Sequence, residues 1–375
     1  MSNPPRVLFV GRARYRLPLP AWLAKKWDAV AEELDYRILG AAEPGSPLHA
    51  DRFRLTAPGR PSRLDGILFY LRLPLRVRHE VAEFAPDVIV AADPFVGTAV
   101  LVGRRLSGRS TPMIVEVHGD WRTFTRLYGS PSRKWLARAA DASARFALRR
   151  ADATRALSRF TSSLVEEVRG RPADGIFPTY SDLSAFTAAP VADLPERPTA
   201  LFVGALEAYK NVDGLAAAWR RVVAQLPEAK LVIVGRGSRN AVIERLVREL
   251  PEHVAHVAQL EPDEVARAFD AATLLVLPSW PEGLGRVVIE AFARGRGVVA
   301  TNAGGIPDLV TDGQEGILIP PGAEDALVEA LVRVLSDSTL ATSLGEAAHV
   351  RYAAWHTTPA EFAAAYRVLV DRTLT

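Results

Sequence analysis

Short apolar runs recur along the chain, and most precede a longer stretch whose apolar residues have helical spacing. The runs are rich in Val, Ile and Leu without strict alternation, which is typical of strands buried on both faces of a parallel sheet. Strands are expected at residues 6–10, 87–91, 113–117, 153–157, 200–203, 230–234, 273–277, 298–301 and 317–319. Helices are expected over 135–150, 214–225, 241–250, 263–271, 287–294 and 324–335. This alternation predicts an α/β protein with doubly wound parallel sheets.

The pattern breaks near residues 184–198, where three prolines and several small residues suit an interdomain linker. We therefore expect a Rossmann-like N-terminal domain over 1–184, a linker over 185–198 and a second Rossmann-like domain over 199–352. Residues 353–375 are expected to form a helix that crosses back to the first domain. A chain of 375 residues is long enough for two domains of ordinary size.

Composition narrows the class of protein. The sequence has no cysteine, which excludes disulfides, thiol nucleophiles and cysteine-bound zinc. No apolar run reaches the roughly 18 residues of a membrane-spanning helix, and the N-terminus lacks the layout of a signal peptide. We expect a soluble cytoplasmic protein. The net charge is +10 over 1–190 and −7 over 191–375, so either the first half faces an anionic partner or arginines decorate its solvated surface.

Residues 60–79 mix arginines with bulky apolar side chains. The pattern suits a segment that lies peripherally on an anionic membrane, at its inner face. It also suits an amphipathic helix that packs on its own domain, which is the favoured interpretation. Pro74 is expected to interrupt a continuous helix here.

The strongest chemical signal is Glu282-Gly283-Leu284-Gly285, which follows a predicted strand and opens a predicted helix. Glycines let the backbone approach a ligand closely, and a helix N-terminus offers N–H groups and partial positive charge to a phosphate. Glu282 and Glu290 are natural acceptors for hydroxyl groups, as on a sugar and a ribose. The combination predicts a nucleotide-sugar site, and the alternative is a surface turn with solvated glutamates.

The spacing of Glu282 and Glu290 resembles the E-x(7)-E signature of the family-four retaining glycosyltransferases of GT-B fold. Segments at 203–212, 231–237, 303–308 and 312–316 are similar to other segments of that family in order and spacing. The resemblance covers 199–322 well and 1–190 more thinly. It implies two Rossmann-like domains that face a cleft, an acceptor-side domain over 1–184 and a nucleotide-sugar-binding domain over 199–352. It also implies transfer of a sugar from a nucleotide-diphosphate donor to a hydroxyl acceptor, in polysaccharide, glycolipid or other glycoconjugate biosynthesis.

The resemblance also implies residue roles. Glu282 would bind hydroxyls of the donor sugar, helped by the backbone N–H groups of Gly283, Leu284 and Gly285, while Glu290 would hold the ribose.

Lys210 would neutralise the diphosphate, because a fixed cation stabilises the charge that grows on a leaving group. Gly204, Gly235 and Arg236 would line the nucleotide side of the same site.

One position departs from the family, which usually has arginine where Ala205 follows the strand glycine. Arg286, Arg236 or Arg12 are the candidates to replace that cation. The departure leaves open a non-catalytic subunit that binds a sugar nucleotide or a partner. A phosphorylase or epimerase of the same architecture is a further alternative.

In the first half, His118 follows a predicted strand, and by resemblance it contacts the donor sugar near the reacting carbon. Gly11 lies in an arginine-rich loop after the first strand, where the family has a glycine-rich loop near the diphosphate. Asp120 is interpreted as a solvated acid.

Other chemistries lack their motifs. The segment 235–237 has no third glycine in register for a nicotinamide-binding fingerprint, and no P-loop motif occurs. No Asp-x-Asp occurs, as the metal-dependent GT-A transferases have, so neither a metal nor a cofactor is expected. A UDP-, GDP- or ADP-sugar would be the co-substrate. No recognised nucleic-acid-binding module is present, so nucleic acid is not an expected partner.

Overall fold

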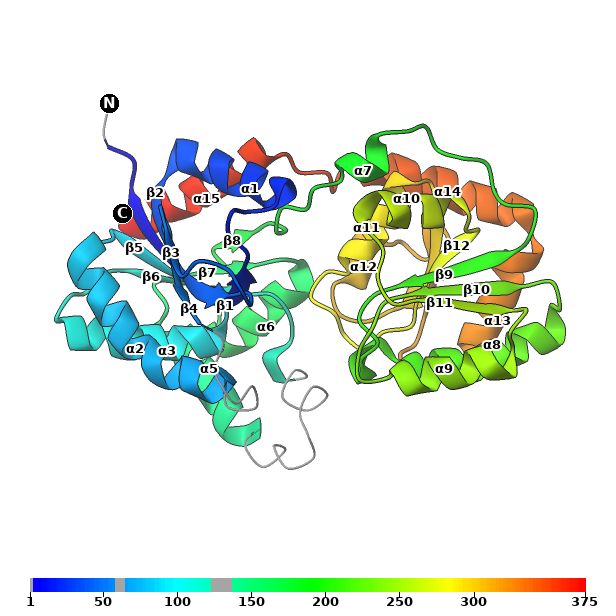
Figure 1. Ribbon diagram of the computed structural model, residues 1–375, viewed down its shortest axis with the longest axis horizontal. Coiled ribbons are helices and arrows are strands. Elements are labelled where there is room, and N and C mark those ends of the chain that lie inside the picture. Colours follow the sequence, from blue (N-terminus) through cyan, green and yellow to red (C-terminus); the bar gives the residue numbers. More distant parts are fainter. Residues whose placement is uncertain (1–2, 58–64, 123–136) are drawn as a thin grey trace. The chain divides into compact units, whose positions relative to one another are not determined.

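The computed structural model describes residues 3–57, 65–122 and 137–375. These residues group into two compact units: the first holds the described residues up to 180 together with 357–375, and the second holds 181–356. Each unit is built on its own sheet (Figure 1). None of the described helices is long and apolar enough to cross a bilayer.

The first unit contains an eight-stranded sheet in the order β3-β4-β2-β1-β5-β6-β7-β8, parallel except for the pair β3–β4. The chain reverses its direction across the sheet between β1 and β5, and open α/β sheets bind ligands beyond the strand ends at such a point. The strands are β1 (Arg6–Tyr15), β2 (Asp35–Ala42), β3 (His49–Ala50), β4 (Phe53–Thr56), β5 (Val88–Ala91), β6 (Met113–Val117), β7 (Ala153–Ala156) and β8 (Gly175–Ile176).

Helices cover both faces of this sheet (Figure 1). Along β1, Leu8 and Val10 enter the core on one face, whereas Val7 and Phe9 enter the core on the other, as the two-residue period of a strand requires. One face carries α2 (Asp65–Phe84), α3 (Pro94–Ser107), α5 (Ala137–Arg150) and α6 (Arg159–Arg169). The other carries α1 (Ala21–Glu33) beside α15 (Pro359–Leu374), so the last helix of the chain completes the first unit.

The helix break expected at Pro74 is wrong, because α2 runs through this residue. The helix is held by α3, where Gly103 leaves no room for a side chain: a Cβ there would lie 2.6 Å from the Pro74 carbonyl oxygen. Phe69, Leu73 and Val77 of α2 are buried in the core of the first unit, which favours packing on its own domain. Residues 60–64 of the basic segment lie outside the described residues.

The second unit contains a six-stranded parallel sheet in the order β11-β10-β9-β12-β13-β14. Its core surrounds the fully buried Trp219. The strands are β9 (Thr199–Val203), β10 (Lys230–Val234), β11 (Val254–Val257), β12 (Leu274–Leu277), β13 (Gly297–Thr301) and β14 (Gly316–Ile319). The helices are α7 (Ser184–Thr187), α8 (Val212–Gln225), α9 (Asn240–Glu249), α10 (Pro262–Asp270), α11 (Arg286–Ala293), α12 (Ile306–Leu309), α13 (Glu324–Ser336) and α14 (Ser338–Tyr352).

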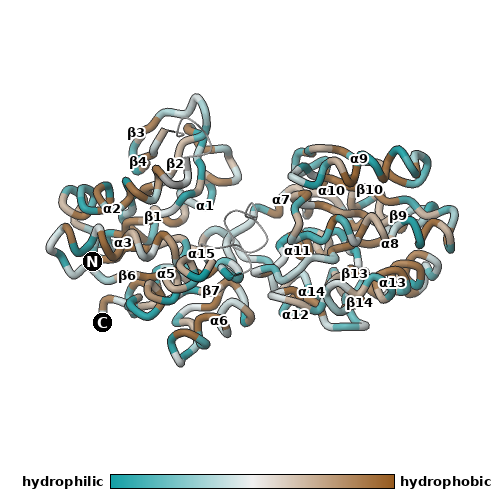
Figure 2. Tube along the Cα trace, turned by 90° about the horizontal axis from the view of Figure 1, so that it is seen from below, coloured by the Kyte–Doolittle hydropathy of each residue, from teal (hydrophilic) through white to brown (hydrophobic). Residues whose placement is uncertain are grey.

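Hydrophobic and hydrophilic stretches alternate along the helices of both units (Figure 2), in keeping with one face toward a sheet and one toward solvent. Together the two sheets confirm the expected α/β class with two Rossmann-like parallel sheets. Each expected strand is present. The largest difference between an expected and an observed strand is at β1, which was expected to end at residue 10 but continues to Tyr15. The start expected for one helix at Trp135 lies outside the described residues.

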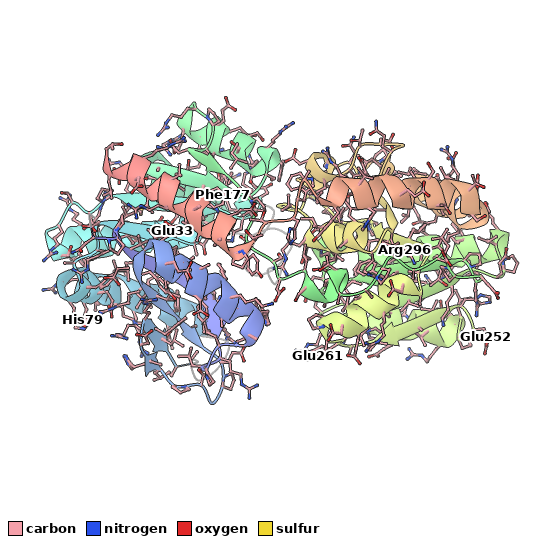
Figure 3. All side chains as sticks on the ribbon, turned by 90° about the horizontal axis from the view of Figure 1, so that it is seen from above. Glu33, His79, Phe177, Glu252, Glu261 and Arg296 are labelled. Carbon is pink, nitrogen blue, oxygen red and sulfur yellow. The ribbon has the colours of Figure 1, made fainter. Side chains whose placement is uncertain are left out.

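The segment 185–198, expected to be a linker, groups with the second unit. Two buried arginines that follow α11 hold it. Arg294 donates to the carbonyl oxygens of Ala189 and Pro190, both at 2.7 Å, and Arg296 (Figure 3) donates to that of Ala192 at 2.9 Å.

Candidate functional site

The carboxyl ends of the parallel strands in the second unit meet at one edge, and four loops interlock there. The loops after β9 and β10 are joined by a bond from the Leu206 N–H to the Arg236 carbonyl, 3.1 Å. The loop after β12 bonds to both neighbours: the Trp280 N–H donates to Tyr209 at 2.7 Å, and the Glu282 carbonyl accepts from Gly305 at 2.8 Å. Because the loops are tied through their backbones, their side chains hold fixed positions at this edge.

Lys210 and Glu282 form an ion pair at this edge, with Nζ 2.7 Å from Oε1 and both side chains about nine-tenths buried. Lys210 closes a short 3₁₀ turn (Ala208–Lys210) after β9. Gly204 makes room for its side chain, because a Cβ on Gly204 would lie 3.4 Å from the Lys210 Cε. A buried cation and carboxylate are stable only when paired, so a ligand that separates them must supply a substitute partner to each.

Glu290 lies one turn into α11, on the same edge. Burial raises the pKa of its carboxyl to about 7, although the positive charges of Arg286 and Lys210 oppose the shift. The helix begins after Gly285, whose φ of +84° is left-handed. The first N–H groups of a helix have no acceptor inside it, so the backbone that follows Gly283 and Leu284 presents donors beside these two glutamates.

Gly235 and Gly204 touch through their backbones. A Cβ on Gly235 would lie 1.8 Å from the carbonyl oxygen of Gly204, and the φ of Gly235 is +146°, so only glycine fits. Arg236 follows in an exposed part of the loop, with its backbone carbonyl bonded to Leu206. The structure thus brings together all the candidate residues that the sequence placed in the second half.

The position of Ala205 is exposed at the same edge. Of the cations expected to replace an arginine there, Arg286 opens α11 and acts electrostatically on Glu290, and Arg236 lies in the loop after β10. Arg12 belongs to the first unit.

In the first unit, Gly11 and His118 line a cavity of about 130 Å³, together with residues of β5 and β6. The expectation that Gly11 lies in a loop after the first strand is wrong, because β1 continues through it to Tyr15. A Cβ on Gly11 would lie 2.8 Å from the Cβ of Ala92, so β1 and β5 approach closely at the point where the strand order reverses. The His118 ring is partly exposed, and its Nε2 lies 3.1 Å from Oε2 of Glu116. Asp120, interpreted as a solvated acid, is instead mostly buried, and it accepts hydrogen bonds from the Arg122 backbone and side chain.

The sequence interpretation missed Glu116, Arg155 and Tyr366, which join His118 in one hydrogen-bond network. The available signal was a charged residue inside each of two apolar strands, β6 and β7, at positions that pair in the sheet.

A possible metal-ligand group among the described residues is formed by His79, Glu80 and Glu83 on α2. Arg37 already donates to both glutamates, at 2.7 and 3.0 Å. These contacts favour a salt-bridge cluster. The expectation that the protein needs no metal and no cofactor stays a prediction.

Comparisons with known proteins identify the family to which this chain belongs. The family model described as "Glycosyl transferases group 1" matches residues 189–351. The family model described as "Glycosyl transferase 4-like domain" matches residues 13–179. The chain belongs to the group 1 glycosyltransferases.

Among curated members of this family, the chain is 28% identical to a sulfoquinovosyl transferase of Arabidopsis thaliana over 75% of this chain and 57% of that protein. It is equally identical to the alpha-D-kanosaminyltransferase of Streptomyces kanamyceticus, over 75% of each chain. A D-inositol 3-phosphate glycosyltransferase of Corynebacterium aurimucosum is matched over 39% of its length, so the chain spans only part of several curated relatives.

Solved glycosyltransferases share the fold of this family member. A sucrose-phosphate synthase from Thermosynechococcus elongatus superposes with a TM-score of 0.74 at 20% identity, covering 98% of this chain and 97% of that one. The Anabaena protein HepE, solved in complex with UDP-glucose, superposes with a TM-score of 0.70 at 16% identity over 98% of this chain and 100% of that one. The GT-B fold class is therefore confirmed.

Proposed function

We propose that this group 1 glycosyltransferase moves a sugar from a nucleotide-diphosphate sugar to a hydroxyl acceptor with retained anomeric configuration, in glycoconjugate biosynthesis. The observation that carries the proposal is the buried pair of Lys210 and Glu282 beside Glu290. A fixed cation suits a diphosphate leaving group, and carboxyl groups suit the hydroxyls of a sugar and a ribose.

A donor satisfies both members of the ion pair at once. The diphosphate supplies the negative partner that Lys210 needs, and the sugar hydroxyls donate to the Glu282 carboxylate with help from N–H groups near Gly285. Glu290 is about half protonated near pH 7, because burial raises its pKa to that value. Its reduced negative charge lowers repulsion of the diphosphate and leaves hydrogen-bonding capacity for the ribose.

The reaction then needs little covalent participation from the protein. The bond between the anomeric carbon and the diphosphate oxygen breaks, and the acceptor oxygen bonds to that carbon from the same face. The acceptor proton passes to a diphosphate oxygen. Lys210 and the first turn of α11 stabilise the negative charge that develops on the diphosphate. His118 contributes a hydrogen bond to the sugar.

The nucleotide would lie over Gly204, Gly235 and Arg236, where the absence of side chains on the two glycines lets the base and ribose approach the backbone. Because HepE was solved with UDP-glucose, a UDP-sugar is the first donor to test. GDP- and ADP-sugars are the alternatives, and the acceptor is any compound with a nucleophilic hydroxyl.

Calorimetry with UDP-, GDP- and ADP-sugars, followed by donor hydrolysis and transfer assays, tests the proposal. The expected result is micromolar to millimolar binding of one donor, slow hydrolysis without acceptor, and a product whose anomeric proton coupling matches that of the donor. Binding without hydrolysis or transfer across an acceptor panel would instead favour the non-catalytic subunit suggested by Ala205.

A further inference from the structure

Glu116 is a carboxylate buried within the sheet of the first unit, on a strand whose residues are all buried. Its neighbour on the parallel strand β7 is Arg155, which pairs with it in register, so both side chains leave the sheet on the same face. The Arg155 Nη1 donates to Glu116 Oε1 at 2.5 Å. Arg155 is 1% exposed, so this is a fully desolvated ion pair.

The same oxygen of Glu116 also accepts a hydrogen bond from the hydroxyl of Tyr366 on α15, 250 positions along the chain. Tyr366 is buried, and its ring packs edge-on against Phe177, with centroids 5.3 Å apart. Phe177 lies beside α15 (Figure 3), and the Arg155 guanidinium stacks over its ring at 4.3 Å. The C-terminal helix therefore clamps the buried ion pair from one side.

The second oxygen of Glu116, Oε2, lies 3.1 Å from Nε2 of His118. Burial alone would raise the pKa of Glu116, but the charges of Arg155 and His118 outweigh it and lower the pKa to about 2. An ionised carboxylate only accepts hydrogen bonds. Nε2 of His118 must therefore carry the hydrogen, and in the neutral ring the lone pair is on Nδ1.

We propose that Arg155 and Tyr366 fix Glu116 as a positioning residue, which sets the ring orientation and the Nε2–H tautomer of His118. His118 then offers Nδ1 as an acceptor to a sugar hydroxyl, and α15 is an integral part of the site in the first unit. The contact with sugar rests on the proposed function, whereas the tautomer and orientation do not.

The electrostatic setting of Glu116 supports a permanent carboxylate. The ionisable groups that act on it are Arg155 on β7, His118 after β6, Tyr366 on α15, Tyr15 on β1 and Asp93 after β5. Arg155 is the one that forms a close ion pair with an unconditional positive charge. Arg155 and Tyr366 both hold Oε1, so Oε2 is the oxygen that faces the histidine.

Nitrogen-15 NMR of the imidazole rings tests the tautomer directly on the full chain. His118→Gln identifies the His118 signals among the seven histidines. At pH 8, wild type should show His118 with a protonated Nε2 and an unprotonated Nδ1. Glu116→Gln should shift this ring toward a mixture of tautomers, and Tyr366→Phe should broaden or shift the same signals. An Nδ1–H ring in wild type, or unchanged signals in both variants, would overturn the proposal.

Kinetics with the active donor gives the second readout. Tyr366→Phe should lower kcat about tenfold, as expected for a lost orienting hydrogen bond, with the donor KM changed less than about twofold. In a His118→Gln background the same change should cost less than about twofold, because Tyr366 acts through His118. Equal losses in both backgrounds would mean a merely structural role and would refute the positioning claim.

Tyr36→Phe is the matched control. Tyr36 is a buried tyrosine whose ring packs on Phe9, as that of Tyr366 does, and its hydroxyl interacts with Arg52. The Tyr36→Phe variant should leave the His118 signals and kcat unchanged. If no donor is bound or turned over by wild type, the proposed function fails while the NMR result still decides the role of Glu116.

Discussion

The Nζ of Lys210 lies 2.7 Å from Oε1 of Glu282, although 72 positions separate the two residues in the sequence. Four interlocked loops bring them together at the carboxyl edge of the second sheet. Removing one partner of a buried ion pair leaves an uncompensated charge, whereas neutralising both partners leaves none. Stability and activity should therefore respond differently to single and double substitutions.

Lys210→Met and Glu282→Gln should each destabilise the protein, by about 3 kcal/mol for the lysine, whose loss leaves a buried carboxylate. The double variant should recover most of that stability. Turnover should fall by on the order of a hundredfold or more in all three, since each lacks the cation that stabilises the leaving group, the carboxylate that binds the sugar hydroxyls, or both. Urea unfolding and a transfer assay measure the two effects. Activity that recovers together with stability in the double variant would contradict the assigned roles.

Gly235→Ala should be far more damaging than an equivalent change at Gly313. Both glycines have positive φ, but a Cβ on Gly235 would meet the Gly204 carbonyl at 1.8 Å, whereas nothing lies within 4 Å of one on Gly313. Gly313→Ala should cost about 1 kcal/mol of unfolding free energy, from backbone strain alone. Gly235→Ala should cost more than about 3 kcal/mol and abolish donor binding in calorimetry. Similar costs for the two would show that the loops after β9 and β10 separate readily.

Leu71 and Leu75 are exposed one turn apart on α2, at 69% and 61%, with the exposed Arg72 and Arg78 nearby. Although the buried face of α2 favours packing on its own domain, these exposed side chains allow a test of the alternative, a peripheral contact with an anionic membrane. Leu71→Glu with Leu75→Glu should reduce co-sedimentation with vesicles rich in anionic lipid several-fold. Val350→Glu, at an exposed valine of the second unit, is the control and should have no effect. Failure of wild type to sediment would remove the membrane from the expected partners.

The strands that the sequence predicted best are those buried on both faces of their sheet. Runs such as 230–234 and 113–117 were predicted with correct ends because continuous Val and Ile segments have few other stable environments. The strands β3, β4, β8 and β11, which lie at or next to a sheet edge, are short or partly polar, and β2 is interrupted by Gly40, so periodicity alone did not reveal them. Pro74 was misjudged because tertiary packing on α3 outweighs the lost hydrogen bond of a proline.

The candidate site likewise contains residues that a local sequence motif predicts and residues that only the folded structure brings together. The roles proposed for Glu282 and Glu290 rest on a local strand–loop–helix motif, which a sequence displays directly. The pairing of Lys210 with Glu282 and of Tyr366 with Glu116 depends on contacts between distant segments. No local pattern encodes such contacts, and a lone tyrosine in an amphipathic helix is indistinguishable from a core residue.

Arg294 is predicted to anchor the segment 185–198 to the second unit through its bonds to the carbonyls of Ala189 and Pro190. Arg294→Met keeps the length of the side chain but removes the donor to these carbonyls, to the buried Phe186 carbonyl and to the Asp270 carboxylate, which should cost about 2 to 4 kcal/mol. Limited proteolysis should then cut within 185–198 several-fold faster. The control is Arg220→Met, at an exposed pair with Glu249, which should cost less than about 1 kcal/mol. Unchanged cleavage in Arg294→Met would show that the segment is held by other contacts.

Glu290 predicts a specific dependence of stability on pH. Burial raises its pKa from 4.5 to about 7 in the folded protein, so folding favours the protonated form. The stabilisation is fully present below about pH 4.5 and is lost as the pH rises through about 7, because the folded state must then hold a buried charge. The loss is on the order of 3 kcal/mol, at 1.36 kcal/mol per pKa unit. Glu290→Gln mimics the protonated form and should lack this decline.

Urea unfolding of wild type and Glu290→Gln at pH 5 and pH 8.5 measures the difference. The variant should equal wild type within about 0.5 kcal/mol at pH 5 and exceed it by roughly 2 to 3 kcal/mol at pH 8.5. Glu261→Gln, in an exposed capping box at the start of α10, is the control and should show no such pH-dependent gain. A Glu290→Gln variant less stable than wild type at pH 8.5 would contradict this prediction. It would show that the folded protein stabilises the ionised carboxylate of Glu290. That carboxylate would then accept hydrogen bonds from both ribose hydroxyls without first losing a proton.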